Sequence, residues 1–136
     1  MNKDDFEHRV IGHILFNGAL YEIAGQDKEH IIRMGDLGIE FEKPTSEVHY
    51  SDLYILENDK LYLDAIRLEN CWGRFPIING VKALSTPDAV IYKGLKMPVN
   101  YTGTIIVRRG KKGRERIYRI TLNGGEVMGM ENIGNE

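Results

Sequence analysis

The chain has one cysteine, four prolines and one tryptophan, and it has no apolar run near the roughly 18 residues that a membrane-spanning helix needs. Cys71 therefore has no partner for an intramolecular disulfide bond. The first residues, Met-Asn-Lys-Asp-Asp, lack the apolar segment of a secretory signal. Together these absences predict a reduced, cytoplasmic protein with no membrane partner.

The linear motifs of catalysis and cofactor binding are also missing. Cys71 is followed by Trp72, as in thiol proteases, but the flanking Gly-Ser is absent and all four histidines precede it. The sequence contains no Gly-x-Ser-x-Gly, no metal-binding Cys or His pair and no Walker-type loop. We therefore expect a non-enzymatic protein without cofactor or metal, in which Cys71 packs beside Trp72. A site assembled from distant strands, such as two carboxylates, would leave no linear trace and stays open.

Length and composition are those of one globular domain. The chain of 136 residues is 42% hydrophobic and 28% charged, and a chain of this size buries about two-thirds of its unfolded surface. We expect a single β-rich domain over residues 1–136, with residues 1–5 and 131–136 flexible at its ends.

Short apolar, β-branched and aromatic runs alternate with turn residues along the chain. Three Asn-Gly steps lie between such runs, at residues 17–18, 79–80 and 123–124. Asn-Gly tolerates the positive φ angles of a two-residue hairpin turn, so each step predicts a hairpin. The predicted strands are Val10–Phe16, Ala19–Ala24, Tyr54–Glu57, Lys60–Leu68, Phe75–Ile78, Val81–Leu84, Tyr101–Arg109, Arg114–Leu122 and Glu126–Met130.

This spacing predicts a mainly β fold, an antiparallel, hairpin-rich barrel or sandwich with at most one short helix. Residues 88–95 are compatible with either a helical turn that starts after Pro87 or a short strand. Residues 43–52 are predicted to form a loop because Pro44 and a polar cluster interrupt any period. Alternation along 60–68 places Leu61 and Leu63 on one face and Ile66 on the other.

The most uneven feature of the sequence is its charge. Residues 108–119 carry a formal +6 within a chain whose net charge is −2. Gly110–Gly113 is the expected turn, with Lys111 and Lys112 at the tip. Alternation places Arg114 and Arg116 on one face, and Arg109 and Arg119 on others. The seven cations of this predicted hairpin are Arg108, Arg109, Lys111, Lys112, Arg114, Arg116 and Arg119.

Three interpretations of these cations stay open. Clustered cations bind phosphates, and tyrosines can stack bases, so a nucleic acid is one candidate partner. An acidic protein surface is the second candidate. A solvated hairpin whose charge prevents edge pairing is the third interpretation.

An acidic excess lies elsewhere, since residues 27–69 contain eleven acidic and five basic residues. Glu40 and Glu42 flank Phe41 and should share a face, with Phe41 turned inward. Together with Asp59 and Asp64 they form a hypothetical acidic face. It could meet the basic hairpin of the same molecule or of another copy, or the basic cleft of a nucleic-acid enzyme, or it could be an ordinary solvated strand surface.

Two uncharged segments, Phe75-Pro76-Ile77-Ile78-Asn79-Gly80-Val81 and Asn100-Tyr101-Thr102-Gly103-Thr104-Ile105-Ile106-Val107, together with the β-rich layout, resemble small immunity proteins of bacterial polymorphic and contact-dependent toxin systems. The resemblance implies a cytoplasmic inhibitor that occludes a partner toxin domain and catalyses nothing. It assigns no site residue, because these proteins share no common motif.

The leading hypothesis is therefore a binding protein whose docking surface is either the acidic face or the 108–119 hairpin. Charged patches would speed encounter and buried aromatic anchors would supply affinity. Two alternatives come from other classes: a β-barrel carrier of a small molecule, and a nucleic-acid-binding protein that uses the hairpin. Partner identity and oligomeric state stay open.

Overall fold

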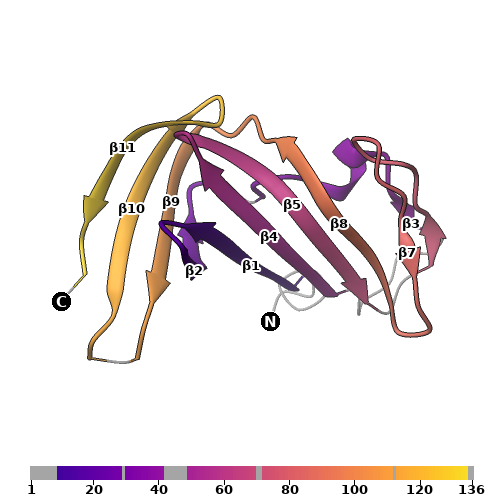
Figure 1. Cartoon of the computed structure of the whole chain (residues 1–136), viewed down its shortest axis with the longest axis horizontal. Helices are drawn as coiled ribbons and strands as arrows, with labels where there is room; N and C mark the ends of the chain where they lie inside the picture. The colour runs from indigo at the N-terminus through magenta and orange to yellow at the C-terminus, as the bar shows by residue number, and fades with distance from the viewer. Residues whose placement is uncertain (1–8, 29, 42–48, 70–71, 112, 135–136) are drawn as a thin grey trace.

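The computed structural model describes residues 9–28, 30–41, 49–69, 72–111 and 113–134 and consists almost entirely of β-strands (Figure 1). The helical content of these residues is one 3₁₀ turn, η1 (Met34–Leu37). The strands are β1 (Arg9–Phe16), β2 (Ala19–Gln26), β3 (Glu40–Phe41), β4 (His49–Glu57), β5 (Lys60–Glu69), β6 (Gly73–Arg74), β7 (Leu84–Ser85), β8 (Ala89–Pro98), β9 (Gly103–Arg109), β10 (Arg116–Asn123) and β11 (Glu126–Asn132).

Seven of these strands close into a barrel, in the order β11-β10-β9-β2-β1-β4-β5. Closure rests on the pair Glu126↔Lys60 and on two backbone hydrogen bonds, Leu61 N to Gly125 O and Val127 N to Asp59 O, each 2.8 Å. β8 and β7 extend the sheet from the free edge of β5, and β3 and β6 form a separate two-stranded sheet. The predicted mainly β fold is confirmed, and it is a barrel.

One pairing departs from the expected antiparallel pattern. β1 and β4 run parallel, from Arg9↔His49 to Leu15↔Ile55. A tight hairpin cannot join parallel neighbours; here the chain passes through β2, η1 and β3 between β1 and β4, which gives the long connection that parallel pairing requires. β4 begins at His49, so the expected loop 43–52 was wrong for residues 49–52; residues 43–48 lie outside the described part of the chain.

Two of the three Asn-Gly steps form turns, whereas the third turn is Gly124-Gly125 because Asn123 is the last residue of β10. Asn17 and Gly18 have φ angles of 52° and 73°, and they join β1 to β2. Asn79 and Gly80 also form a turn, but the expected strands beside it are reduced to the single bridge Ile78↔Val81. Here the side chain of Asn79 donates to Leu95 O at 2.6 Å. The segment is therefore tied to β8 by side-chain contacts instead of a ladder.

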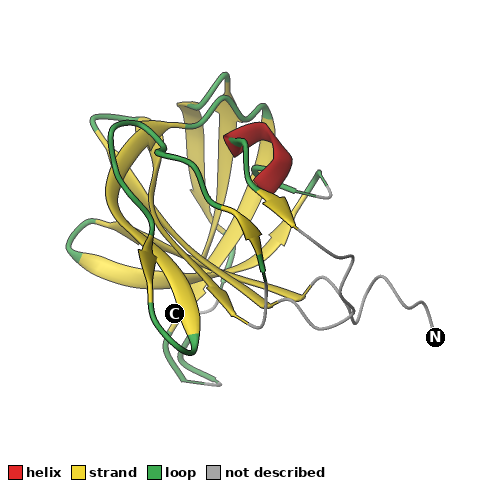
Figure 2. Cartoon of the chain, turned by 90° about the vertical axis from the view of Figure 1, so that its right-hand side faces the viewer, coloured by secondary structure: helices red, strands yellow, loops and turns green. Residues whose placement is uncertain are grey.

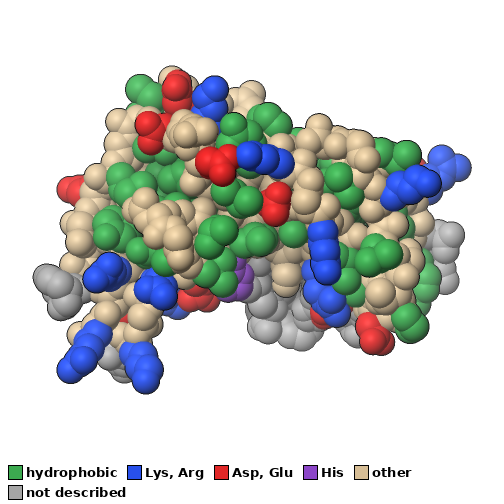
Figure 3. All heavy atoms as spheres, in the orientation of Figure 1, with side chains coloured by type: hydrophobic (Ala, Val, Ile, Leu, Met, Phe, Trp, Pro, Cys, Tyr) green, Lys and Arg blue, Asp and Glu red, His purple; other side chains and the backbone are tan. Residues whose placement is uncertain are grey.

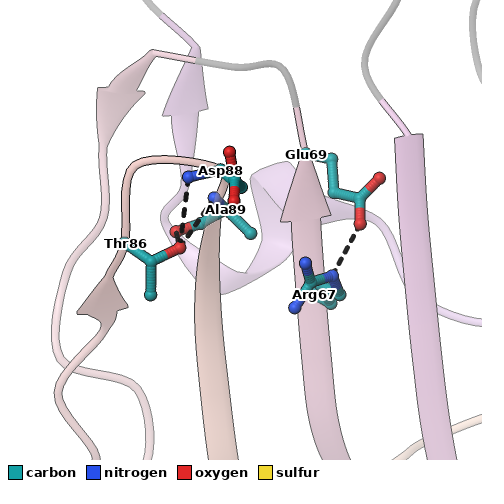
Figure 4. A network of polar contacts seen from close by, with 5 residues as sticks. All are labelled: Arg67, Glu69, Thr86, Asp88 and Ala89. Atoms are coloured by element: carbon teal, nitrogen blue, oxygen red, sulfur yellow. Dashed lines mark hydrogen bonds and ion pairs between the residues drawn. The ribbon is translucent and has the colours of Figure 1, made fainter.

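The helical alternative for residues 88–95 was wrong, because this stretch lies in β8. The polar residues before it form a turn (Figure 4). The Thr86 hydroxyl oxygen accepts hydrogen bonds from the N–H groups of Asp88 at 3.3 Å and Ala89 at 3.0 Å. Thr86 N in turn donates to Ala89 O at 2.8 Å. These contacts reverse the chain between β7 and β8 instead of starting a helix.

A β-bulge alters the expected alternation in β5. Leu61 and Leu63 are both buried, consistent with the shared face expected for them, but Ile66, expected on the other face, is buried as well, at 1% exposure. The register of β5 against β4 and β8 shifts at Asp64, whose carboxylate accepts the N–H of Lys96 at 3.2 Å. An extra residue at a bulge turns the following side chains to the other face. Ile66 therefore points into the core.

Figure 2, turned by 90° from Figure 1, shows the strands curving around a common interior, and the buried hydrophobic side chains form one core cluster. Its largest fully buried side chains include Tyr54 of β4, Leu63 of β5 and Tyr92 of β8. At the C-terminus, Ile133 N and Gly134 N both donate to Ile117 O. The end expected to be flexible from residue 131 is thus held to β10 as far as residue 134.

Candidate functional site

The cationic segment is confirmed as a hairpin, formed by β9 and β10, and it projects from the barrel (Figure 1). Its Lys and Arg side chains gather at the lower left of Figure 3. The connecting loop covers residues 110–115 and is longer than the expected turn, so Arg114 lies in the loop and not in a strand. Arg114 N donates to Lys111 O at 2.8 Å. Lys112 lies outside the described residues.

Two cations of the hairpin have acidic partners on the outer face of the barrel. Arg108 Nε lies 3.0 Å from Glu22 Oε1 on β2, and Arg119 Nη1 lies 2.7 Å from Glu131 Oε1 on β11. Both ion pairs are exposed, so each contributes at most about 1 kcal/mol to stability. Their main effect is to neutralise these two arginines within the molecule.

Arg109 and Arg116 lie directly opposite each other on the other face. The register pairs them, next to the pair Val107↔Tyr118, whose Val107 is fully buried. The expectation that Arg109 and Arg116 point to different faces was wrong, because residues paired directly across an antiparallel ladder lie on the same face of the sheet. The six-residue loop sets which arginine is opposite Arg109, namely Arg116 and not Arg114. Neither arginine has an ion-pair partner among the described residues. Like charges in opposite positions of an antiparallel pair repel each other.

Lys111 and Arg114 extend this charge to the tip. Both are exposed, and both lack an ion-pair partner within the described part of the chain. The hairpin end, defined as Arg109, Lys111, Arg114 and Arg116, therefore presents four cations that form no ion pair with any residue the structure describes. Its local potential favours an anionic partner.

An aromatic cluster supports the base of the hairpin end. The rings of Phe16 and Tyr21 stack at 4.3 Å, and Tyr118 packs edge-on at 6.0 Å and 5.9 Å from them. Phe16 and Tyr21 are buried and Tyr118 is half-buried. Tyr118 is the only aromatic residue of the hairpin, and its ring is already packed against the barrel. It is thus poorly placed to stack on a base.

The residues of the hypothetical acidic face lie on separate elements. Glu40 is exposed on β3, and in the backbone ladder it lies opposite Arg74 of β6. Asp59 lies in the β4–β5 turn, and Asp64 lies at the bulge of β5, where its carboxylate is engaged by a backbone N–H. Glu42 lies outside the described residues. Phe41 packs against the core as predicted, but these acids do not gather as the hairpin cations do.

A buried carboxylate was not predicted from the sequence. Asp52 on β4 is 5% exposed, and it lies between Gly12 of β1 and Ile66 of β5. Tyr54 Oη donates to its Oδ2 at 3.2 Å, whereas its Oδ1 has no hydrogen-bond partner among the described residues. Burial raises the pKa of Asp52 from 3.8 to about 6, and the hydrogen bond from Tyr54 opposes this rise. Because residues 43–52 were predicted to form a loop, Asp52 was not placed in a strand. In β4, Asp52 and Tyr54 are two residues apart and therefore lie on the same, inward face.

No other chemistry is assembled by the described residues. No group of three or more His, Cys, Asp or Glu side chains among them could hold a metal ion. Trp72, expected to pack beside Cys71, is 63% exposed. The neighbouring Gly73 lies in close contact with the backbone of β3. Cys71 itself lies outside the described part of the chain. No helix in the described ranges has the length and apolar character to cross a membrane.

No family model, curated protein or solved structure matches the chain. Function is therefore inferred from the geometry of the hairpin end and from the chemistry of its surroundings.

Proposed function

We propose that this chain is a non-enzymatic binding protein of the cytoplasm, which docks an acidic protein surface onto its hairpin end. The observation that carries the proposal is the cross-strand pair Arg109 and Arg116, which has no counter-ion among the described residues. Elsewhere on the same hairpin, Arg108 and Arg119 are neutralised by Glu22 and Glu131. An acidic partner would relieve the repulsion between the two free arginines, and steering by four cations would speed encounter.

A protein surface is favoured over a nucleic acid by the packing of Tyr118. Single-strand binders combine a cationic groove with exposed aromatic platforms, but this ring packs against Phe16 and Tyr21. A carrier function is not favoured either, because buried side chains of the barrel strands, such as Tyr54 of β4 and Ile105 of β9, belong to one packed core.

An immunity-type inhibitor is the specific form of this proposal that the sequence resemblance supports. In that form the hairpin end covers an acidic region at the active site or an adjacent exosite of a toxin domain, and inhibition follows from occlusion. The inhibitor contributes no catalytic group. Co-expression with a candidate toxin domain should then restore growth, and the restoration should depend on the cations of the hairpin end.

The test compares three immobilised proteins exposed to extract of the source organism: the unmodified chain, the variant R109E/R116E, and the matched control K82E/K93E. Lys82 and Lys93 are exposed cations away from the hairpin, so the two variants change net charge equally. A protein partner should be retained by the unmodified chain and the control, be lost from R109E/R116E, and survive nuclease treatment. Equal retention by all three proteins would refute docking at this site. Loss on nuclease treatment would favour the nucleic-acid alternative.

A further inference from the structure

The last strand of the barrel has an edge without a strand partner. β11 pairs with β10 from Glu126 to Asn132, with Met128 as the extra residue of a β-bulge, but it pairs with β5 only at Glu126↔Lys60. The last hydrogen bond on this side of β11 runs from Val127 N to Asp59 O, in the turn before β5. From Met128 to Asn132 the second edge of β11 has no partner among the described residues, and β11 forms the margin of the sheet in Figure 1.

This edge lacks lysine and proline, two of the devices that protect the edge strands of soluble proteins, and its one irregularity is a β-bulge at Met128. Lysine, proline or a covering segment normally prevents pairing with another chain. Residues 128–132 (Met-Gly-Met-Glu-Asn) contain neither lysine nor proline. Met128 is 63% exposed and Met130 is 41% exposed, and Ile133 follows at 40%. The edge thus offers free backbone donors and acceptors beside exposed apolar side chains.

We propose that β11 pairs antiparallel with β11 of a second copy, about a two-fold axis at Met130. The contact with β5 ends at Val127, so the free edge covers residues 128–132 and Met130 is its midpoint. In this register Met130 faces Met130 of the second copy, Met128 faces Asn132, and Gly129 faces Glu131. The interface is isologous, the commonest arrangement in soluble dimers.

The charges of the edge favour a second copy over a charged peptide. Glu131 is the only charged residue in 128–132, and Arg119 of the same chain already pairs with it at 2.7 Å. A basic or acidic partner strand would therefore find no free counter-charge. In the two-fold register each Glu131 lies opposite Gly129, which has no side chain, so no like charges oppose each other.

The ladder is short, and the buried area is smaller than that of an obligate dimer. We therefore expect weak self-association that depends on protein concentration. The β11 edge is a surface separate from the hairpin end, and pairing through it does not rest on the proposed function.

Disulfide trapping tests the register. In a Cys71→Ser background, Met130→Cys should form an intermolecular disulfide with oxidised glutathione, because opposite residues in an antiparallel pair have Cα atoms about 4.5–5.5 Å apart, within the range for a disulfide. Met128→Cys is the matched control. It is more exposed, but its two copies would lie four residues apart along the strands, about 14 Å. Analytical ultracentrifugation over a range of concentrations measures the dimer without any cross-link.

The expected result is a concentration-dependent dimer in the unmodified protein, rapid cross-linking of the Met130→Cys variant and little cross-linking of the Met128→Cys variant. Met130→Lys should shift the protein to monomer while its circular dichroism stays unchanged, because a lysine is placed at the centre of the pairing edge. A monomer at every concentration would overturn the proposal. Equal cross-linking of the two cysteine variants, or a dimer that survives Met130→Lys, would also overturn it, by placing the interface elsewhere.

Discussion

Replacing Asp52 by Asn should change how the stability of the barrel depends on pH. Asp52 is buried, and its Oδ1 has no hydrogen-bond partner among the described residues. The ionised carboxylate is therefore poorly solvated, and its pKa rises from 3.8 to about 6. The folded protein binds this proton more tightly than the unfolded chain does, so protonation of Asp52 stabilises the fold.

The size and sign of the effect follow from these two pKa values. At about 1.4 kcal/mol per pKa unit, a rise from 3.8 to about 6 corresponds to about 3 kcal/mol. This stability is fully present below the unfolded pKa of 3.8, and it is lost as the pH rises through about 6. The amide of the Asp52→Asn variant carries no such proton, so the variant lacks this pH dependence.

The assay is urea denaturation of both proteins at several values between about pH 4 and about pH 7.5. Taking the difference between the two free energies of unfolding removes the contribution of all other titrating groups. It also makes the constant cost of burying the amide irrelevant, because only the slope is used. Relative to the variant, the unmodified protein should lose about 2.5 kcal/mol, most of this stability, across this range. A flat difference, or one of opposite slope, would show that Asp52 is solvated or paired in the folded protein.

Three further substitutions test other contacts. Arg109→Glu places opposite charges across the β9–β10 ladder, so it should stabilise the fold by up to about 1 kcal/mol in urea denaturation while abolishing partner capture; destabilisation would argue against the observed register. Gly73→Ala should lower the melting temperature, because its Cβ would overlap the backbone of β3, whereas the control Gly35→Ala meets nothing within 4 Å and should have a small effect. Tyr92→Phe removes the 2.7 Å bond from its Oη to Pro76 O and should cost about 1 kcal/mol in chemical denaturation; an unchanged free energy would mean that water replaces this bond.

The hairpins of this fold are predictable because their turns are encoded locally. Asn17-Gly18 and Asn58-Asp59 all adopt positive φ angles, as two-residue turns between strands require. The apolar runs on either side of each turn then become strands. For the same reason the cationic segment is recognisable as one hairpin from its sequence.

Barrel closure and the geometry of the site depend on contacts between distant segments. The parallel β1–β4 pair and the Glu126↔Lys60 closure leave no local signal. The placement of Arg109 opposite Arg116 depends on a loop only two residues longer than the expected turn, because a slip of register changes which side chains meet. The burial of Asp52 could not be predicted for a similar reason. Its strand, β4, begins within a polar stretch and forms through pairing with β1 and β5.

The central claim, that the hairpin end docks an acidic partner, is tested most directly by the association rate with the purified partner as a function of salt concentration. For the unmodified chain and the K82E/K93E control, the rate should be high at low salt and fall steeply as salt is added. For R109E/R116E it should be low and nearly independent of salt. The same rate and the same salt dependence in all three proteins would contradict the account.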